Sequence, residues 1–205
     1  MLLTPYQKDI FQELVNIGVG RAASVLNKMV NSHIELHAPD IQLLDTDRFL
    51  QDFLTTKMET VSAIKLSFEC AFPGTAALVF SPEIASNLIT LLIDEQPLSD
   101  DFDMLRIGAL EELGNIVLNS VIGTFSNILG EDINFITPEY YQDTFENLVI
   151  SSSNVQGMVL LVRAHFRCED RSIYGDIIIF FSLVSLEKLL ESFDKLCENT
   201  QMQNT

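Results

Sequence analysis

The chain contains an internal repeat, and this repeat limits its fold more than any other feature of the sequence. The segment ELVNIGVGRAASVLNKMVNSHIELHAP at 13–39 aligns with ELGNIVLNSVIGTFSNILGEDINFITP at 112–138, at a shift of 99 residues. A second pair aligns at a shift of 101 residues, and it consists of GTAALVFSPEIASNLITLL at 74–92 and GDIIIFFSLVSLEKLLESF at 175–193. Self-similarity at a nearly constant spacing is typical of one structural unit used twice.

Both halves of the repeat are expected to belong to a single domain that spans 1–205. The halves cover about 1–98 and 99–197, and a polar tail occupies 198–205. The segment DEQPLSDDFD at 94–103 joins the halves, and it is a short, acidic, turn-rich connection rather than a long flexible linker. A chain of 205 residues is long enough to bury a sizeable core.

Local patterns predict where the elements of the first half begin and end. Thr4 is a good N-cap and Pro5 suits the first position of a helix. Pro39 interrupts the strand that follows, which suits a sheet edge or a β-bulge. The expected elements are a helix at 5–30, a strand at 33–44, a short helix or turn at 46–55, strands at 61–70 and 75–81, and a helix at 82–93.

The second half repeats this order and leads to a fold class. Its expected elements are a helix at 103–129, strands near 132–138, at 156–168 and at 173–182, and a helix at 185–197. Helices that alternate with hairpin-like strand pairs predict an α/β (α+β) fold with a largely antiparallel sheet. Two copies imply a pseudo-twofold arrangement in which the two long helices are neighbours.

The charge balance excludes several kinds of partner. The chain has 29 Asp and Glu residues against 12 Lys and Arg residues, for a formal charge of −17. Nucleic-acid binding requires cations that neutralise phosphates, and the sequence has no basic cluster. We therefore expect neither a nucleic acid nor an anionic membrane surface as a partner. A protein with a positively charged rim would instead be attracted.

The sequence also indicates a compartment. No apolar run approaches the roughly 18–20 residues that would span a membrane, so no membrane insertion is expected. The N-terminus lacks the charged and apolar regions of a signal peptide. Cys70, Cys168 and Cys197 show no motif spacing, which suits a reducing environment. A cytoplasmic location follows as an expectation.

Polar and small residues share one narrow face of each long predicted helix when residues are placed at about 100° intervals. These residues are Asp9, Glu13, Asn16, Gly20, Ser24 and Asn27 in the first helix, and Gly108, Glu112, Asn115, Asn119, Gly123 and Ser126 in the second. On the far side of the first helix, the period predicts a face toward the core that consists of Phe11, Val15, Ala22, Leu26 and Met29. One interpretation is that each face is simply the solvated side of an amphipathic helix. The repeat favours a functional face, because solvent-facing positions tolerate most substitutions and yet Glu-x-x-Asn-Ile is kept twice.

The chemistry of an acid and an amide one turn apart suggests what such a face could do. An Asn amide does not take up a proton near neutral pH, but it can hold a water molecule by hydrogen bonds and aim it, as Gln does for the attacking water in small GTPases. Glu at i−3 lies on the same face, where it could meet a cation of a partner or help to orient the water. Such a pair suits a reaction in which the substrate brings most of the catalytic groups.

The spacing of these residues resembles the signature of the CheC family of chemotaxis phosphatases, which includes CheX and FliY relatives. That signature is Asp or Ser, three residues, Glu, two residues, Asn, twenty-two residues and Pro. The first copy here is Asp9, Glu13, Asn16 and Pro39, and the second contains Glu112, Asn115 and Pro138 with the same long spacing. The phrase NIGVGRAA is also similar to the first helix of that family, and the resemblance spans nearly the whole chain.

The resemblance implies a fold, an activity and roles for residues. The family has a pseudo-symmetric α/β domain with two long helices beside a continuous antiparallel sheet, and its members dephosphorylate the response regulator CheY. By resemblance, Asn16 and Asn115 would each orient the water that attacks the aspartyl phosphate. Glu13 and Glu112 would each meet a lysine of the regulator's active site. The chain would need no cofactor of its own, because the regulator supplies Mg²⁺, and a CheD-type deamidase is a further possible partner.

The flanking residues of the two motifs differ. Position 108 is Gly where the family motif has Asp or Ser, whereas Asp9 fits that motif, so the first site is expected to be the stronger of the two. Asp9, Gly20, Arg21 and Asn119 are expected to contact the partner, since they lie on or beside the motif face.

Two other interpretations remain open at this stage. The domain could be a non-catalytic module that binds a response regulator or a CheD-type protein, which Gly108 supports, or an unrelated acidic scaffold, which would leave the repeated spacing unexplained. A metal site is not expected. His33 and His37 lie at i, i+4 in a predicted strand, but a metal site needs further ligands and His165 is distant in sequence.

Overall fold

In the computed structural model, the described residues are 3–30, 34–54, 60–92, 102–152, 157–168 and 171–203. The elements of the first half are α1 (Pro5–Val30), β1 (Ile34–Asp45), α2 (Thr46–Leu54), β2 (Val61–Glu69), β3 (Gly74–Phe80) and α3 (Pro82–Leu92). Those of the second half are α4 (Phe102–Leu129), β4 (Asn134–Phe135), β5 (Glu139–Asp143), α5 (Phe145–Ser152), β6 (Gly157–Cys168), β7 (Arg171–Ser182) and α6 (Leu183–Gln203).

The strands form one continuous sheet that both halves share. Within the described residues it has seven strands in the order β1-β6-β7-β3-β2-β4, and β5 also pairs with β2. Every pairing among these strands is antiparallel, which confirms the predicted sheet. The edge strand of each half pairs with a strand of the other half, β1 with β6 and β5 with β2, so the two halves interlock around the central pair β3 and β7.

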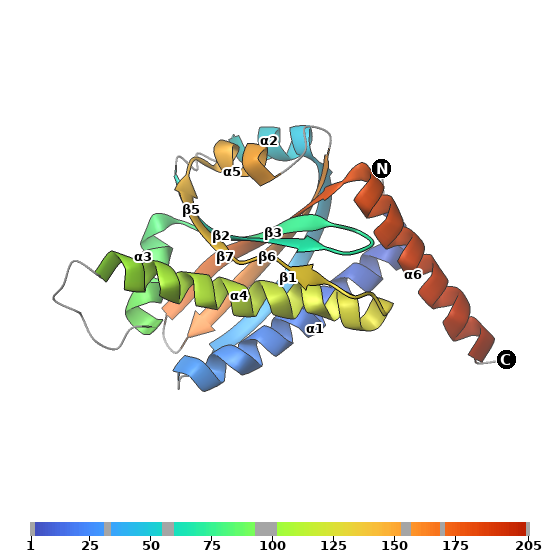
Figure 1. The fold of residues 1–205 in the computed structure, drawn as a ribbon, viewed down its shortest axis with the longest axis horizontal. Coiled ribbons are helices and arrows are strands. Elements are labelled where there is room, and N and C mark those ends of the chain that lie inside the picture. Colours follow the sequence, from blue (N-terminus) through green and yellow to red (C-terminus); the bar gives the residue numbers. More distant parts are fainter. Residues whose placement is uncertain are drawn as a thin grey trace.

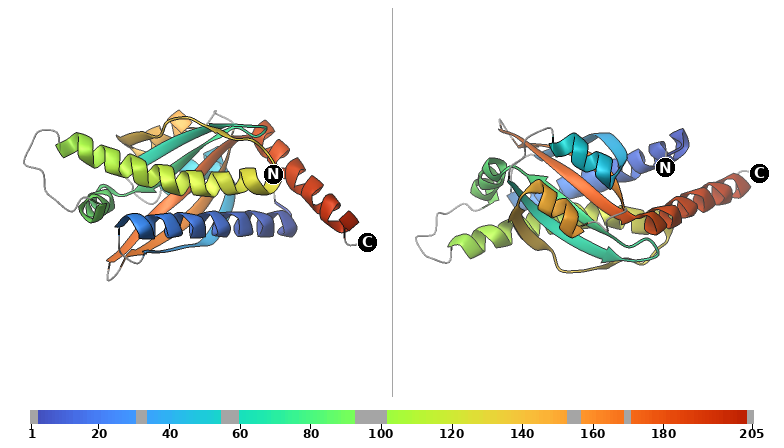
Figure 2. Two further views of the ribbon diagram at one scale, coloured as in Figure 1. Left: turned by 60° about the horizontal axis from the view of Figure 1, so that its bottom comes forward. Right: turned by 90° about the horizontal axis from the view of Figure 1, so that it is seen from above.

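Helices cover both faces of this sheet. The long helices α1 and α4 lie side by side on one face, and α2 and α5 lie on the other (Figures 1 and 2). The larger core lies under the long helices, where Phe11 of α1 packs edge-on against Phe125 of α4 and Phe193 of α6, with ring centroids 6.1 and 4.8 Å apart. The smaller core contains Phe49 of α2 and Phe145 of α5. This arrangement confirms the predicted fold class.

The first turn of α1 is closed by a reciprocal pair of hydrogen bonds. The backbone N–H of Gln7 donates to Thr4 Oγ1 at 3.2 Å, and the backbone N–H of Thr4 donates to Gln7 Oε1 at 3.1 Å. This is a capping box, which satisfies two N–H groups that the helix itself cannot. Thr4 is therefore the N-cap and Pro5 the first helical residue, as the sequence predicted.

Replacing Thr4 by alanine is expected to lower the free energy of unfolding by about 1 kcal/mol, because an N-cap side chain typically contributes that much. Urea denaturation of the Thr4→Ala variant checks this expectation. The Thr4→Ser variant keeps a hydroxyl acceptor and serves as the control, with a stability close to that of the parent. Equal losses for Ala and Ser would contradict the capping account.

Both edge strands are interrupted at the proline that ends each motif. The register of β1 on β6 shifts between His37 and Asp40, around Pro39. In the second half, β4 pairs with Phe68 and Glu69 of β2, and β5 pairs with β2 only from Glu139 onwards, so the break spans Pro138. The interruption matches the role of proline, which cannot donate to a strand ladder.

Several boundaries differ from those the sequence predicted. Pairing near 132–138 is limited to the two residues of β4, and the unpredicted β5 follows it. The segment EYYQD gave no strand signal, because its burial does not alternate and both of its ends are charged and exposed. Helix α5 was also not predicted, although Phe145, Leu148 and Val149 form a buried stripe. Helix α6 continues to Gln203 through residues expected to form a tail, since CENTQMQ contains no Gly or Pro to end it.

No helix among the described residues is long and apolar enough to cross a membrane.

Candidate functional site

The helices that carry the two motifs are in backbone contact. They run antiparallel (Figure 2, left), and their backbones come close together at Gly18 of α1. A Cβ atom at Gly18 would lie 2.6 Å from the Cα of Val121 and 3.0 Å from the carbonyl oxygen of Ser120. Only a residue without a side chain allows this approach. The expected proximity of the long helices is thus confirmed, and Gly18 makes it possible.

The motif of the first helix lies on an open surface. Asp9, Glu13, Asn16 and Gly20 are all exposed, and a Cβ atom at Gly20 would have no described atom within 4 Å. The opposite side of the helix is buried in the core and includes Phe11, Val15, Ala22 and Leu26. The helix therefore presents its acid and its amide to solvent from a rigid, packed scaffold.

The motif of the second helix has a different environment. Gly108 and Glu112 are exposed, but Asn115 and Asn119 are half-buried. Asn119 Nδ2 donates a hydrogen bond of 2.7 Å to Asn115 Oδ1. Asn119 Oδ1 is buried and has no hydrogen-bond partner among the described protein groups. Gly20 is the residue of the first copy that aligns with Asn119. The two motifs therefore share their acid and their amide, but only the second has a neighbouring side chain that bonds to the amide.

Arg21 joins the two helices instead of lying free beside the first motif. Its Nη1 donates to Thr124 Oγ1 at 3.2 Å, and that hydroxyl donates in turn to the carbonyl oxygen of Ser120 at 2.8 Å. Thr124 is fully buried, whereas Arg21 is exposed. The contact of Arg21 with a partner stays a prediction, and the structure adds an interhelical role that the sequence did not indicate.

The Arg21→Ala variant is expected to lose about 0.5–1.5 kcal/mol of stability, the typical net contribution of one hydrogen bond. A double-mutant cycle with Thr124→Val, followed by urea denaturation, isolates that contact. We expect the two losses to be less than additive, because either change removes the same bond. Fully additive losses would show that the bond contributes nothing.

Glu111, which belongs to neither motif, fixes α4 to the sheet next to the second motif. Its Oε1 accepts a hydrogen bond of 3.0 Å from the backbone N–H of Tyr140 in the edge strand β5. Gln12 precedes Glu13 in the first motif as Glu111 precedes Glu112 in the second, and it is also a hydrogen-bond acceptor and half-buried. The polar residue before each motif Glu was the sequence signal that could have identified Glu111.

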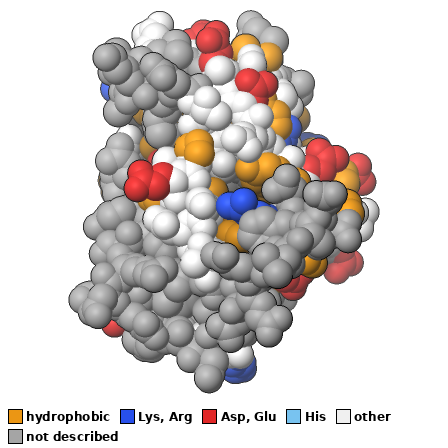
Figure 3. All heavy atoms as spheres, turned by 90° about the vertical axis from the view of Figure 1, so that its left-hand side faces the viewer, with side chains coloured by type: hydrophobic (Ala, Val, Ile, Leu, Met, Phe, Trp, Pro, Cys, Tyr) orange, Lys and Arg blue, Asp and Glu red, His pale blue; other side chains and the backbone are white. Residues whose placement is uncertain are grey.

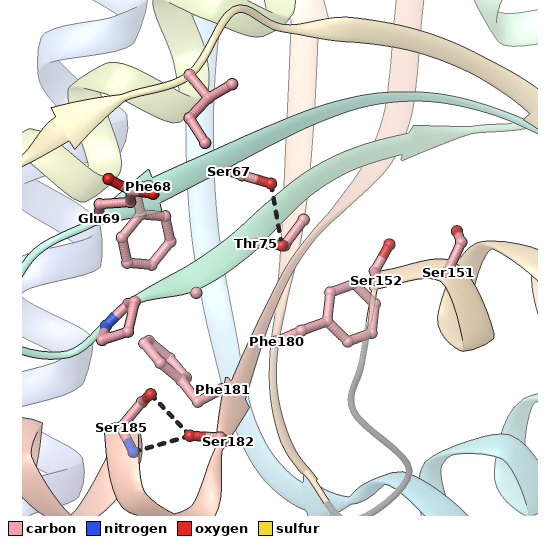
Figure 4. Close-up of a pocket in the computed structure, with 13 residues that line it drawn as sticks. Ser67, Phe68, Glu69, Thr75, Ser151, Ser152, Phe180, Phe181, Ser182 and Ser185 are labelled. Atoms are coloured by element: carbon pink, nitrogen blue, oxygen red, sulfur yellow. Dashed lines mark hydrogen bonds between the residues drawn. The ribbon is translucent and has the colours of Figure 1, made fainter.

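Two pockets among the described residues are lined by residues other than the two motif amides. One pocket of about 380 Å³ is lined by hydroxyl groups, including those of Ser67, Thr75, Ser152, Ser182 and Ser185 (Figure 4). A second pocket lies between α3 and the start of α4. Near it Met104, Leu105 and Ile107 are exposed, and hydrophobic side chains are visible on that end of the molecule (Figure 3). Neither of these two pockets is lined by Asn16 or Asn115, so neither encloses a motif amide.

The sheet brings together two histidines that are distant in sequence. The strand register places His37 of β1 directly opposite His165 of β6, although they are far apart in the chain, and His33 lies outside the described residues. Among the described residues, no group of three or more His, Cys, Asp or Glu side chains is placed to hold a metal ion.

Comparison with curated proteins identifies a relative. No family model matches the chain. The chain is 30% identical over 146 residues to the CheY-P phosphatase CheC of Bacillus subtilis (strain 168), and the match covers 68% of each protein.

Comparison with solved structures shows how widely the fold occurs. Thermotoga maritima FliY matches with a TM-score of 0.75 and 21% identity, over 96% of this chain and 100% of that one. A chain of the FliM–SpeE complex from H. pylori matches with a TM-score of 0.70 and 15% identity, over 95% and 97%. A chain of the CheX–CheY–BeF3–Mg²⁺ complex from Borrelia burgdorferi matches with a TM-score of 0.54 and 21% identity, over 83% and 99%. At these identities the likeness establishes the fold alone.

Proposed function

The chain belongs to the CheC/CheX/FliY family, and from this premise we propose that it hydrolyses the aspartyl phosphate of a CheY-like response regulator. The observation that carries the proposal is the doubled Glu-x-x-Asn motif, which two adjacent helices present at the surface of a chain related to a CheY-P phosphatase. Because such a regulator acts inside the cell, we also propose a cytoplasmic location.

In this proposal the amides of Asn16 and Asn115 orient the water molecule that attacks the phosphorus atom. An amide can accept a hydrogen bond from the water and donate another to it, which holds the water oxygen toward the phosphorus. Transfer of a phosphoryl group requires little covalent chemistry from the protein, so positioning and charge stabilisation provide most of the catalysis. A surface amide on a rigid helix supports this role.

The carboxylates of Glu13 and Glu112 would meet a lysine in the active site of the regulator. Both are exposed, and each lies one helical turn before its amide. A charge-assisted hydrogen bond to an ammonium group would set the distance between the amide and the phosphate. The net charge of −17 favours association with a positively charged rim. The regulator, rather than this chain, would hold the Mg²⁺ ion that neutralises the phosphoryl oxygens.

The test is an assay of phosphate release. The protein is mixed with a phosphorylated CheY-like regulator and Mg²⁺, and loss of the aspartyl phosphate is followed against the regulator alone. Acceleration that depends on both motifs supports the proposal. If phosphate is lost at the spontaneous rate in the presence of the protein, the proposed hydrolysis is wrong.

Replacing Glu13 and Glu112 together by glutamine is expected to weaken binding of the regulator by roughly 10–100-fold, because a hydrogen bond to a charged group contributes about 1.5–3 kcal/mol. The affinity for a beryllofluoride-activated regulator measures this effect without interference from turnover. Glu83→Gln is the matched control, since Glu83 is an exposed acid on α3. Unchanged affinity in the double variant would remove the carboxylates from the interface.

A second candidate is an adaptor that binds the regulator, or a CheD-type deamidase, without hydrolysing phosphate. Two observations favour it. Gly108 replaces the first residue of the second motif, and the fold is shared with the middle domain of FliM. The adaptor alternative predicts that the protein binds the phosphorylated regulator and leaves the rate of phosphate loss unchanged.

A further inference from the structure

We propose that Asn119 is a positioning residue that holds the amide of Asn115, so that the second motif is preorganised for water orientation and the first motif is not. The proposal rests on the proposed function and adds a residue to its second site. It also reverses the expectation from Gly108 that the second site is simply the weaker one.

The geometry of the helix explains how one amide can hold the other. Residues at i and i+4 lie one above the other, and helical side chains point back toward the N-terminus. Asn119 therefore reaches toward Asn115, and its Nδ2 bonds to Asn115 Oδ1 at 2.7 Å. This bond uses one lone pair of Oδ1. The second lone pair and both N–H groups of Asn115 stay available for a water molecule.

The burial of the Asn119 side chain does not favour the stability of the fold. Asn119 Oδ1 is buried and has no hydrogen-bond partner among the described protein groups, and a buried acceptor left in this way is destabilising. A small apolar residue at this position would avoid that penalty. The amide at position 119 is therefore better explained by the hydrogen bond that its Nδ2 donates to Asn115 than by a contribution to folding.

The first motif has no such support. Gly20 aligns with Asn119, and Asn16 is exposed where Asn115 is half-buried. The space beside Gly20 is open, because a Cβ atom there would have no described atom within 4 Å. Asn16 must therefore be ordered in the bound complex at the moment the attacking water is aligned, which costs side-chain entropy that the second site has already lost.

Positioning and partner contact predict different kinetics for Asn119. A residue that touches the regulator changes the affinity, whereas a residue that orders Asn115 changes the rate at saturation. The Asn16→Ala background isolates the second site, and Asn119→Ala is then compared with Asn127→Ala, an exposed asparagine further along α4. We expect Asn119→Ala to lower the saturating rate of phosphate loss by roughly three- to tenfold, the effect of freeing one side chain, with affinity for the beryllofluoride-activated regulator unchanged.

Side-chain NMR tests the positioning independently of turnover. In the parent, the Nδ2H2 group of Asn115 should show a higher ¹⁵N order parameter than that of Asn16. The Asn119→Ala variant should lower the Asn115 value, and Gly20→Asn should raise the Asn16 value. An Asn115 amide that stays equally ordered without Asn119 would overturn the proposal, and a simultaneous loss of thermal stability would assign Asn119 a structural role.

The outcomes separate this inference from the proposed function. If the Asn16→Ala/Asn115→Ala double variant is as active as the parent, the phosphatase proposal fails, while the NMR result still decides whether Asn119 orders Asn115. A drop in affinity with an unchanged saturating rate would make Asn119 a docking contact and would also overturn the positioning role.

Discussion

Replacing Asn16 and Asn115 together by alanine is expected to slow protein-stimulated dephosphorylation of the regulator by about 100-fold or more, the cost of misplacing a reacting group by about 1 Å. Alanine removes both the acceptor and the donors that would hold the attacking water. It leaves the helices packed, because Asn16 is exposed and Asn115 only half-buried. Single-turnover assays with excess protein measure the rate directly.

Each single variant should retain the activity of the intact motif, since the two faces lie on separate helices. The Asn115→Ala protein reports on the first site and the Asn16→Ala protein on the second. The Asn87→Ala variant carries the same substitution at an exposed position of α3 and should match the parent. If the double variant dephosphorylates as fast as the parent, neither amide orients the water.

Replacing Gly18 by alanine is expected to lower the free energy of unfolding by about 1–3 kcal/mol, the usual range for overpacking a close contact. The added Cβ would lie 2.6 Å from a backbone atom of Val121, so α1 and α4 must move apart to admit it. This loss outweighs the helix propensity that alanine gains over glycine. Urea denaturation with an unchanged slope provides the measurement.

Gly20→Ala is the matched control on the same helix, and its sign should be opposite. The new methyl group meets no described atom within 4 Å, so the variant should be more stable by about 0.5–1 kcal/mol through helix propensity alone. Equal effects at the two glycines would contradict the close approach of the helices at Gly18.

The sequence predicted the parts of the fold that depend on local patterns. Thr4 and Pro5 placed the start of α1, and the 3.6-residue period placed Phe11, Val15 and Leu26 in the core. Strand pairing was less accessible, because the partners are distant in the chain. Nothing local to β1 indicates that it pairs with β6 of the other half. The edge strand β5 was not predicted, because its exposed and intermediate residues do not alternate along the strand.

In the candidate site, too, local patterns predicted some features, whereas contacts between distant residues could not be predicted. The repeat identified Glu13, Asn16, Glu112 and Asn115, and the structure places each of them on the helix face that the period predicted, with the two Glu side chains and Asn16 exposed and Asn115 half-buried. Their catalytic roles stay predictions. Two amides at i and i+4 were a signal in the sequence for the hydrogen bond between Asn119 and Asn115. Whether such a pair forms a hydrogen bond depends on the side-chain rotamers and on burial, which the sequence does not give. The Arg21–Thr124 bond joins two helices and had no local signal.

Turnover by the unaltered protein tests the central claim most directly. The protein is added at about one tenth of the concentration of a phosphorylated CheY-like regulator in the presence of Mg²⁺, and the remaining aspartyl phosphate is measured over time. A phosphatase should release all of the phosphate faster than the regulator does alone, with each protein molecule acting many times. Binding of the phosphorylated regulator with phosphate loss at the spontaneous rate would contradict the claim and would establish an adaptor.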